Sequence, residues 1–586
     1  AVLAWVGLGA DPLSSSAYGP DEAFRALGEH AYLAVAVALA TTITVVTLSL
    51  AYSQIIARFP FGGGGYTVAT ETLGPKWGLV SGAALLVDYV LTISVSLASA
   101  GDQVFSVLGP ELASLKLPFE FAAIGLLVML NLRGVRESVT VLAPIFALFV
   151  VTHAILIFGG IGAHLGEIPD VATEVSTGFR TGAATLGVGG LFALFVRSYT
   201  MGGGTYTGIE AVSNGLQIMR EPKVETARRT MVYIAVSLAI TASGLLLLYL
   251  LFDVQPEPGK TLNAVVLERF ADDWRPAGLP IGHAFVVTAL VSEAALLFVA
   301  AQAGFLDGPR VMANMARDQW LPHRFVQLSE RLTVQDGVLL MGGAAAVTLL
   351  YAGGSITTLV TMYSINIFVT FSLSQLGMVR YWLRRREGTA DARKGLVINS
   401  VALVLCVSIL AGTLYEKVDD GGWVTIGVTG ALVLLCLWVR RHYRNVHSAL
   451  RSLEEILPAL PSEPAGEKPV RVDPKAPTAV MFVGGYGGLG VHALLTVQRL
   501  FPGHFKNFVF ASVGVIDAVV MKGLEEVERT RDHTEDGLKK YVQLANRLGL
   551  AAEHRMIVGT EAVEAGEELA EQIRRDFPRS VVFLGN

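Results

Sequence analysis

The chain has 586 residues, of which 52% are hydrophobic and 16% are charged, and its mean hydropathy is +0.53. About a quarter of the residues of a soluble globular protein are charged, so this composition excludes a string of soluble domains and places most of the chain in a bilayer. Two cysteines, Cys406 and Cys436, exclude a disulfide scaffold, and a net charge of −5 argues against a basic nucleic-acid binder.

Charged residues are spread unevenly and divide the chain into three regions. From Lys475 onward 27 of 112 residues are charged, which is an ordinary share for a soluble domain, and residues 458–477 are rich in proline and charge, as in a linker. We therefore expect a transmembrane domain over 1–440, an amphipathic helix and linker over 441–477, and a soluble domain over 478–586.

Twelve segments approach the length of about 20 mostly apolar residues that a membrane-crossing helix needs. They fall at about 1–27 (interrupted), 31–57, 77–107, 119–132, 137–160, 184–217 (interrupted), 225–252, 281–316, 335–351, 355–379, 396–414 and 422–440. Basic residues number 21 in one set of loops and 7 in the other, and basic loops face the cytoplasm. We expect a multi-pass protein of the bacterial inner or plasma membrane, with both termini and the soluble domain in the cytoplasm.

The first and sixth spans contain helix-breaking residues near their middles. These are Pro12, Gly19 and Pro20 in the first span and Gly202–Gly204 in the sixth. Unwound backbone is tolerated in a membrane only where it is enclosed by protein or lines a watery cavity. Because the two interrupted spans are five apart, the pattern indicates two inverted five-helix halves with a binding site at the two breaks.

Polar residues in the middle of the membrane are costly and mark functional sites. The third span places Asp88, Thr92 and Ser96 on one helical face, because they are spaced by four residues. The other candidates lie near the breaks or in the tenth span: Asp11, Ser14, Ser15, Ser16, Tyr18, Tyr89, Thr205, Tyr206, Thr207, Glu210, Tyr363, Ser364 and Asn366.

These side chains supply carboxylates and neutral oxygens and almost no cationic group. Neutral oxygens replace the hydration shell of a hard cation, while one or two carboxylates balance its charge. The carboxylate of an amino-acid substrate would instead be repelled by Asp11 at the first break. Burial beside another acid favours a protonated carboxyl group, which makes Asp11, Asp88 and Glu210 candidate proton carriers.

Each of these residues also has a structural interpretation. Glu210 can brace the second half of the sixth span, and Asp88 can pair with a basic residue such as Arg197. The hydroxyls of the third span can bond to their own helix backbone, and the two tyrosines near the site can be packing residues or gates.

An enzyme is the class of function with the least support. The chain has no P-loop, zinc-ligand spacing or nucleophile motif, so we expect no catalytic residue, structural metal or cofactor. His153 and His283 stand alone in or near spans, where a histidine is more often a packing or capping residue.

Four segments carry a resemblance over about 440 residues. They are FPFGGGGYTVATETLG after the second span, LNLRGVRES between the fourth and fifth, TYTGIEAVSNG in the sixth and GPRVMANMARDQWLP after the eighth. In this order they resemble the amino acid–polyamine–organocation superfamily. The resemblance implies the LeuT-type fold of twelve transmembrane helices, with a five-plus-five inverted repeat and broken helices 1 and 6.

Within that superfamily, GADPLSSSAYGPDEA, VDYVLTISVS and the soluble domain are similar to the KimA-type potassium importers. The resemblance implies proton-coupled potassium import by a homodimer that is joined through its cytoplasmic domains. It also implies an ion site, with Glu210 and Asp88 as the candidates for proton coupling. The ion-site residues that it implies are Asp11, Tyr18, Asp88, Tyr89, Thr92, Ser96, Thr207 and Tyr363, with Glu210 beside them.

The soluble domain alternates strands with helices, which predicts a parallel sheet covered on both faces. The sequence GGYGGLG follows its first strand and contains Gly484, Gly485, Gly487 and Gly488. It lacks the lysine of a P-loop and the dinucleotide-binding spacing, so it predicts a tight turn, with nucleotide binding as the alternative. The KimA-type resemblance implies a universal-stress-protein-like domain for regulation and dimerisation, with cyclic di-AMP as an inhibitory ligand.

Together these observations predict a secondary transporter that imports potassium ions with protons by alternating access. Its partners are then potassium, protons, the lipid bilayer and a second copy of the chain, with no nucleic acid. An amino-acid or polyamine permease of the same fold remains an alternative, because a polyamine is also cationic. A membrane sensor that signals through its soluble domain and transports nothing is the second alternative.

Overall fold

The computed structural model describes residues 1–60, 64–134, 139–271, 273–274, 280–329, 334–385, 390–417, 421–454, 471–515, 524–559 and 562–584. The chain forms two compact units, which are described separately. The first unit comprises Ala1–Val311 and Gly337–Leu434, and the second comprises Met312–Asp336 and Leu435–Asn586. Of the amphipathic helix and linker expected over 441–477, residues 455–470 lie outside the described residues.

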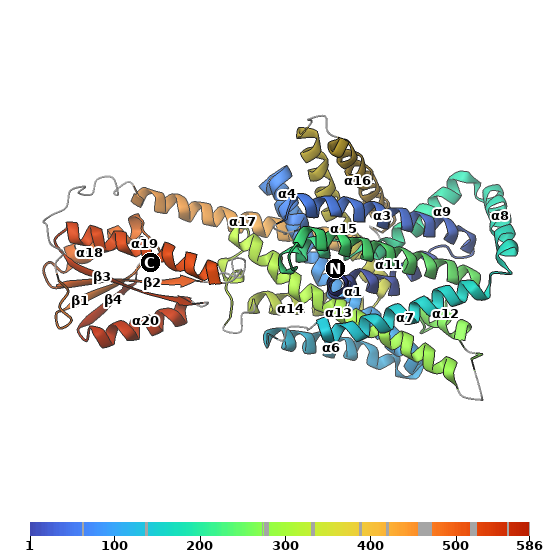
Figure 1. Ribbon diagram of the computed structural model, residues 1–586, viewed down its shortest axis with the longest axis horizontal. Helices are drawn as coiled ribbons and strands as arrows, with labels where there is room; N and C mark the ends of the chain where they lie inside the picture. The colour runs from blue at the N-terminus through green and yellow to red at the C-terminus, as the bar shows by residue number, and fades with distance from the viewer. Residues whose placement is uncertain are drawn as a thin grey trace. The chain divides into compact units, whose positions relative to one another are not determined.

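The first unit is almost entirely helical (Figure 1). Long apolar sequences form its helices because a helix satisfies every backbone hydrogen bond within one segment. The α-helices are α1 (Val2–Ser14), α2 (Gly19–Arg25), α3 (Ala34–Arg58), α4 (Gly64–Leu73), α5 (Pro75–Leu108), α6 (Lys116–Leu132), α7 (Val139–Ala163), α8 (Ile168–Thr185), α9 (Gly187–Met201), α10 (Ala211–Asn214), α11 (Lys223–Leu251), α12 (Leu262–Ala271), α13 (Ile281–Arg317), α14 (Gln335–Ala352), α15 (Ile356–Arg384), α16 (Ala390–Lys417) and α17 (Trp423–Glu454). The 3₁₀ turns are η1 (Ser15–Ala17), η2 (Ala31–Leu33), η3 (Pro110–Leu115), η4 (Gly202–Tyr206) and η5 (Gly215–Ile218).

Ten helices of the described residues are long and apolar enough to cross a membrane, and the bent pair α8 and α9 raises this number to at most 11. These ten coincide with the ten expected spans that were predicted to be uninterrupted. The other two expected spans, the first and the sixth, are each divided into shorter helices. The number twelve and the inverted repeat therefore stay predictions, whereas the helical membrane architecture is clear.

The two interruptions differ in detail from the prediction. The first helix continues through Asp11 and Pro12 as far as Ser14, and the break comes at Ser15–Tyr18 instead. In the sixth span α9 passes into the 3₁₀ turn η4, Thr207 is extended, and α10 begins only at Ala211. Asp11 thus lies on a helix just before the break, and the prediction that placed it inside the break was wrong.

Three helices were not expected from the sequence: α4, α8 and α12. Each lacks a continuous apolar run of membrane-spanning length. Helix α8 is mostly exposed and meets the next helical segment at an angle of 117°. It precedes the sixth span without being part of an uninterrupted crossing.

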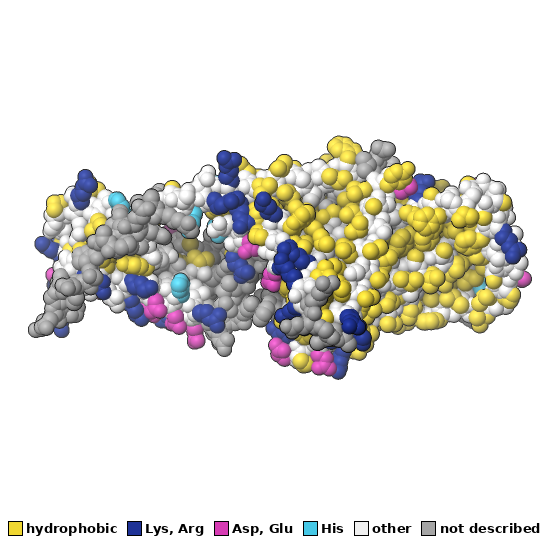
Figure 2. Space-filling view, turned by 90° about the horizontal axis from the view of Figure 1, so that it is seen from above, with side chains coloured by type: hydrophobic (Ala, Val, Ile, Leu, Met, Phe, Trp, Pro, Cys, Tyr) yellow, Lys and Arg dark blue, Asp and Glu magenta, His cyan; other side chains and the backbone are white. Residues whose placement is uncertain are grey.

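Apolar side chains cover the outside of the first unit. Figure 2 shows them over a broad face between regions where charged residues gather. On α3, for example, Leu39, Ile43, Val46 and Leu50 are exposed and spaced by three or four residues, so they form one outward stripe. An exposed apolar surface of this kind suits lipid contact.

The second unit contains a four-stranded parallel sheet. The strands are β1 (Thr478–Phe482), β2 (Asn507–Val515), β3 (Ala551–Gly559) and β4 (Ser580–Leu584), in the order β3-β2-β1-β4. The helices packed with this sheet are α18 (Gly488–Leu500), α19 (Leu524–Arg547) and α20 (Ala562–Asp576), and the second unit also includes the ends of α13 and α17 from Met312 and Leu435 onward.

Side-chain alternation along the strands explains how both faces of the sheet are covered. In β2, Phe508 and Phe510 belong to the core cluster that includes residues of α18 and α19. The alternate residues Val509 and Ala511 belong to the cluster that includes residues of α20. Period-two alternation sends neighbouring side chains to opposite faces, as the sequence predicted for a sheet with helices on both sides.

Candidate cation site

The two interrupted spans meet inside the first unit. The 3₁₀ turn η1 and helix α2 both contact η4, and α15 contacts both η4 and α5. Side-chain bonds reinforce this meeting, because the Ser15 hydroxyl bonds to the Thr205 carbonyl oxygen at 2.9 Å. The first, third, sixth and tenth expected spans therefore enclose one buried region.

Four hydroxyl groups from these four spans form a row in that region. The Tyr18 hydroxyl lies 3.3 Å from Thr207 Oγ1, and Thr92 Oγ1 lies 3.0 Å from the Tyr363 hydroxyl. Tyr18 and Tyr363 also interact electrostatically with each other, so the two pairs lie close together. All four residues are buried. The structure thus brings together hydroxyl groups that were predicted from the sequence. Only Thr92 lies in a segment whose polar residues recur every four positions.

Three buried carboxyl groups interact electrostatically with the tyrosines of this row, although no three acidic, histidine or cysteine side chains of the described residues are grouped closely enough to hold a metal ion by themselves. Asp88 interacts electrostatically with Glu210 and Asp11, and Glu210 interacts with Asp11. Both oxygens of Asp88 and one oxygen of Glu210, Oε2, are buried without a hydrogen-bond partner. Among the described residues, no Lys, Arg or His forms an ion pair with any of the three. Buried carboxyl oxygens without partners are costly, so the region has unused capacity to bind a cation.

Asp11 reaches the site through close packing of the two interrupted spans. Gly208 follows the extended Thr207 with a φ of +78°, and a Cβ atom placed there would lie 2.8 Å from Asp11 Oδ2. Only glycine adopts this conformation readily while leaving that space free. The glycine therefore allows the backbone of the sixth span to approach the Asp11 carboxyl group.

Two residues near the site were missed by sequence reasoning. Asp307 of α13 interacts electrostatically with Asp11 and Glu210, and it also pairs with Arg310 at 3.0 Å. Asn214 donates to the Tyr89 hydroxyl at 2.7 Å and so occupies it. Asn214 lies inside a segment that carried the superfamily resemblance and Asp307 directly precedes another, but neither segment indicated a role for them.

The structural interpretations fare differently. Arg197 pairs with Glu416 at 3.7 Å and is largely exposed, so its expected pairing with Asp88 was wrong. Thr92 bonds both to the Asp88 carbonyl oxygen of its own helix and to Tyr363. Ser96 is buried one turn further along α5 and makes no hydrogen bond to the row of hydroxyls among the described residues.

A cavity of about 640 Å³ extends from Tyr18 toward the loops on one side of the first unit. Charged residues of both signs line it, among them Asp21, Glu22, Asp102 and Lys116. Tyr18 lines the cavity, and its hydroxyl belongs to the row of hydroxyls. The cavity therefore ends beside the candidate site. A hydrated path of this kind is what an ion needs to reach a buried position.

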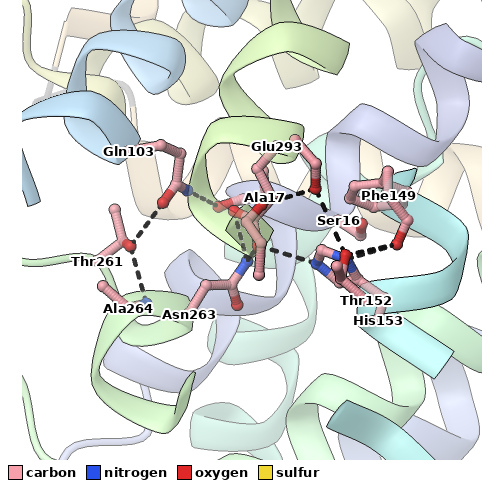
Figure 3. Close-up of polar contacts among 12 residues, drawn as sticks. Ser16, Ala17, Gln103, Phe149, Thr152, His153, Thr261, Asn263, Ala264 and Glu293 are labelled. Atoms are coloured by element: carbon pink, nitrogen blue, oxygen red, sulfur yellow. Dashed lines mark hydrogen bonds and ion pairs between the residues drawn. The ribbon is translucent and has the colours of Figure 1, made fainter. Parts of the chain in front are cut away.

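The sequence suggested that His153 stands alone, but in the structure it has a partner. Its Nε2 atom lies 2.9 Å from Glu293 Oε1, and both side chains are buried (Figure 3). The partner lies 140 residues away on another helix, so no local pattern could reveal the contact.

The glycine-rich loop of the second unit folds around one tyrosine. The Gly487 amide donates to the Tyr541 hydroxyl at 3.0 Å, and that hydroxyl donates to the Gly485 carbonyl oxygen at 2.7 Å. Burial raises the pKa of Tyr541 above its usual range, so the hydroxyl stays protonated and able to donate. This geometry is that of a fixed turn, and nucleotide binding at Gly484, Gly485, Gly487 and Gly488 stays a prediction.

Replacing Tyr541 by Phe should loosen this turn. The change removes both hydrogen bonds of the Tyr541 hydroxyl, each worth about 0.5–1.5 kcal/mol, from the half-buried Gly487 amide and the exposed Gly485 carbonyl oxygen. Hydrogen exchange in the full-length protein should become faster over residues 484–490. Tyr486→Phe is the matched control, because Tyr486 is exposed and its ring only packs beside Tyr541. Equal exchange in both variants would contradict the assignment.

Comparison with known proteins adds the following. A family model described as amino acid permease matches residues 14–438. The potassium transporter KimA of Bacillus subtilis is 31% identical over 454 residues, which cover 76% of this chain and 72% of that protein. The low-affinity putrescine importer PlaP of Escherichia coli is 22% identical over 413 residues, which cover 69% of this chain and 85% of that protein.

Among solved structures, a manganese transporter of Eremococcus coleocola in complex with an aromatic bis-isothiourea compound gives a TM-score of 0.42 at 12% identity. The match covers 76% of this chain and 95% of that one. The relatives found by sequence are transporters and not enzymes.

Proposed function

This chain belongs to the amino acid permease family of the amino acid–polyamine–organocation superfamily, and from that premise we propose that it imports potassium ions together with protons by alternating access. The observation that carries the proposal is the buried group of three carboxyls and four hydroxyls without a basic partner among the described residues. The likeness to the potassium transporter of Bacillus subtilis supports the choice of ion.

The chemistry of the site favours a small hard cation. Hydroxyl oxygens of Tyr18, Thr207, Thr92 and Tyr363 would replace part of the hydration shell, and nearby carboxylates would balance the charge. Tyr89 and Ser96 would lie at the margin of the same site. An amino acid would bring its own carboxylate into a region that already holds three.

Proton coupling is assigned to Glu210 or Asp88. Both are buried among other acids, and each has an oxygen without a hydrogen-bond partner. A carboxyl group in such a place can exchange a proton as a neighbouring cation enters or leaves. A cation and a proton would then compete for the same negative charge, which links the two fluxes.

The direct test is uptake by the purified protein in lipid vesicles. Potassium should be taken up when an inward proton gradient is imposed, and Asp11→Asn should abolish the uptake because it removes a charge beside the site. Asp170→Asn, an exposed change on α8, is the control and should leave uptake unchanged. Undiminished uptake in Asp11→Asn would contradict the site assignment.

Polyamine transport is the second candidate, because the putrescine importer is a relative and putrescine is cationic. A competition assay against labelled potassium separates the two substrates. Excess putrescine should leave potassium uptake intact, whereas strong competition by putrescine would favour the permease. A sensor that transports nothing would show bound ions without flux.

We also propose that the soluble domain faces the cytoplasm and joins two copies of the chain. The excess of basic residues in one set of loops supports this orientation. Single cysteines placed in exposed positions of α18 or α20 should react with a membrane-impermeant thiol reagent only from the cytoplasmic side. Cyclic di-AMP as a ligand of this domain rests on the family resemblance alone.

A further inference from the structure

A buried polar network joins four helices of the first unit outside the candidate cation site (Figure 3). Its central pair is His153 of α7 and Glu293 of α13, and Asn263 of α12 and Tyr249 of α11 complete it. All four side chains are at most 2% exposed. Ionisable groups at this depth in a membrane protein are expensive and commonly serve function.

The hydrogen bonds fix the state of Glu293. The Tyr249 hydroxyl donates to Asn263 Oδ1, which turns the Asn263 amide group toward Glu293. Asn263 Nδ2 lies 3.2 Å from both Glu293 Oε1 and Glu293 Oε2. Both carboxyl oxygens therefore accept hydrogen bonds, as an ionised carboxylate does.

The two ring nitrogens of His153 fix the position of the proton. Nδ1 lies 2.9 Å from the Phe149 carbonyl oxygen, which can only accept, so Nδ1 carries a hydrogen. Nε2 lies 2.9 Å from Glu293 Oε1, and when Glu293 is ionised this contact requires a second hydrogen on Nε2. A histidine with hydrogens on both nitrogens is the charged imidazolium.

We propose that His153 and Glu293 form a proton-binding site, separate from the cation site, that takes up and releases one proton during transport. With the proton bound, the imidazolium and the carboxylate are together neutral. When the N–H bond at Nε2 breaks, the electron pair stays on nitrogen and the proton leaves to water. The pair then carries one negative charge, and the Nε2 lone pair faces a carboxylate oxygen, so the contact weakens. This inference rests on the proposed coupling of transport to protons.

The start of α12 links the cavity to the His153–Glu293 pair. Thr261, which lines the cavity, is separated from Asn263 by one residue, and its hydroxyl bonds to Gln103 Oε1 at 2.9 Å. The start of α12 thus stands between the cavity and the pair. The Leu262 amide donates to Asp21 at 2.8 Å, which holds α12 in this position. Movement of this segment would open the pair to water.

The charged and titratable neighbours of the pair are few. Tyr249 of α11 interacts electrostatically with Glu293, and it also interacts with Asp21 and Arg25 of α2. Asp21 and Arg25 form an ion pair with each other. Within the described residues, no other acid or base pairs with His153 or Glu293, so the proton on this pair is governed mainly by the two groups themselves.

The pair is also placed to affect the first helix. The His153 ring stacks on Phe149 with centroids 3.9 Å apart, and Phe149 belongs to a core cluster with Leu13 of α1 and Leu296 of α13. Helix α1 ends at Ser14, next to this cluster. Loss of the bond between α7 and α13 would therefore loosen the packing around the end of α1.

The first experiment detects the hydrogens on the His153 ring directly and does not require transport. The full-length protein is labelled with ¹⁵N-histidine, and the spectrum of His153→Gln is subtracted to find the His153 signals. At neutral pH the wild type should show hydrogens on both ring nitrogens, and Glu293→Gln should lose one of them. A singly protonated ring in the wild type, unchanged by Glu293→Gln, would overturn the inference, whatever ion the protein carries.

The second experiment measures proton flux and ion flux together in vesicles. In His153→Gln the proton flux per ion should fall by the one proton that this pair carries, and the part of the pH dependence of uptake that the pair sets should be lost. His283→Gln, an exposed histidine on the same helix as Glu293, is the control. A merely structural role would lower uptake equally at every pH, and that result would overturn the inference. Absence of potassium flux in the wild type would contradict the proposed function, while the spectra still decide the proton site.

Discussion

Replacing Asp88 by Asn is expected to abolish potassium uptake and at the same time to stabilise the protein in potassium-free solution. The wild-type carboxyl group is buried with both oxygens unpartnered, beside Glu210 and Asp11. Removing one member of a buried charged interaction costs about 3 kcal/mol of binding, or roughly 100-fold in affinity. Without the cation, the same carboxyl group is a burden, because it either stays charged without a partner, which costs several kcal/mol, or has to take up a proton.

Thermal unfolding with and without potassium measures both effects. The wild type should be stabilised by potassium, by about 2.7 kcal/mol at 100 times the dissociation constant. Asp88→Asn should unfold at a higher temperature than the wild type without potassium and gain nothing when potassium is added. Glu174→Gln, an exposed change on α8, should behave as the wild type. A variant that is less stable and still responds to potassium would contradict the role of Asp88.

Gly208→Ala is expected to destroy transport by displacing Asp11. An alanine at a φ of +78° is strained by about 1–2 kcal/mol. Its Cβ would also lie 2.7 Å from the Pro12 nitrogen and 2.8 Å from Asp11 Oδ2, closer than such atoms approach. Relieving that overlap costs about another 1–3 kcal/mol and moves the Asp11 carboxyl group away from the site.

Gly187→Ala is the matched control for this prediction. Gly187 has a nearly equal φ of +72°, but no described atom lies within 4 Å of the position that an alanine Cβ would take there. Both variants should therefore lose stability through backbone strain, and only Gly208→Ala should lose uptake. Uptake assays and unfolding midpoints on the two proteins separate the effects. Equal loss of uptake would show that strain alone, and not the position of Asp11, is responsible.

The membrane helices were predictable because length and apolarity alone define them. The ten uninterrupted spans follow from runs of about 20 apolar residues, and the two interruptions follow from proline and glycine. Helices α4, α8 and α12 were not predictable in this way, since each is short or amphipathic and takes its position from tertiary contacts. The precise ends of the first break were missed because Pro12 is accommodated inside α1.

The types of residue at the site could be predicted from the sequence, but the contacts between them could not. The row of hydroxyls joins residues far apart in the chain, such as Thr92 and Tyr363, which are 271 positions apart. Asp307 was missed because Arg310, three residues away, gives it an ordinary local partner. Glu293 was missed because its partner His153 lies on another helix, and no periodicity links the two.

The strand order of the soluble domain has a consequence for its synthesis. Strand β1 pairs with β2 on one side and with β4 on the other. The first strand of the sheet to leave the ribosome therefore cannot complete its pairing until the last strand has emerged. Until Ser580–Leu584 has emerged, one edge of β1 is open, and an open edge can pair with a neighbouring chain. The domain can therefore complete its sheet only after β4 has left the ribosome, and a nascent chain stalled before Ser580 would leave that edge of β1 unpaired.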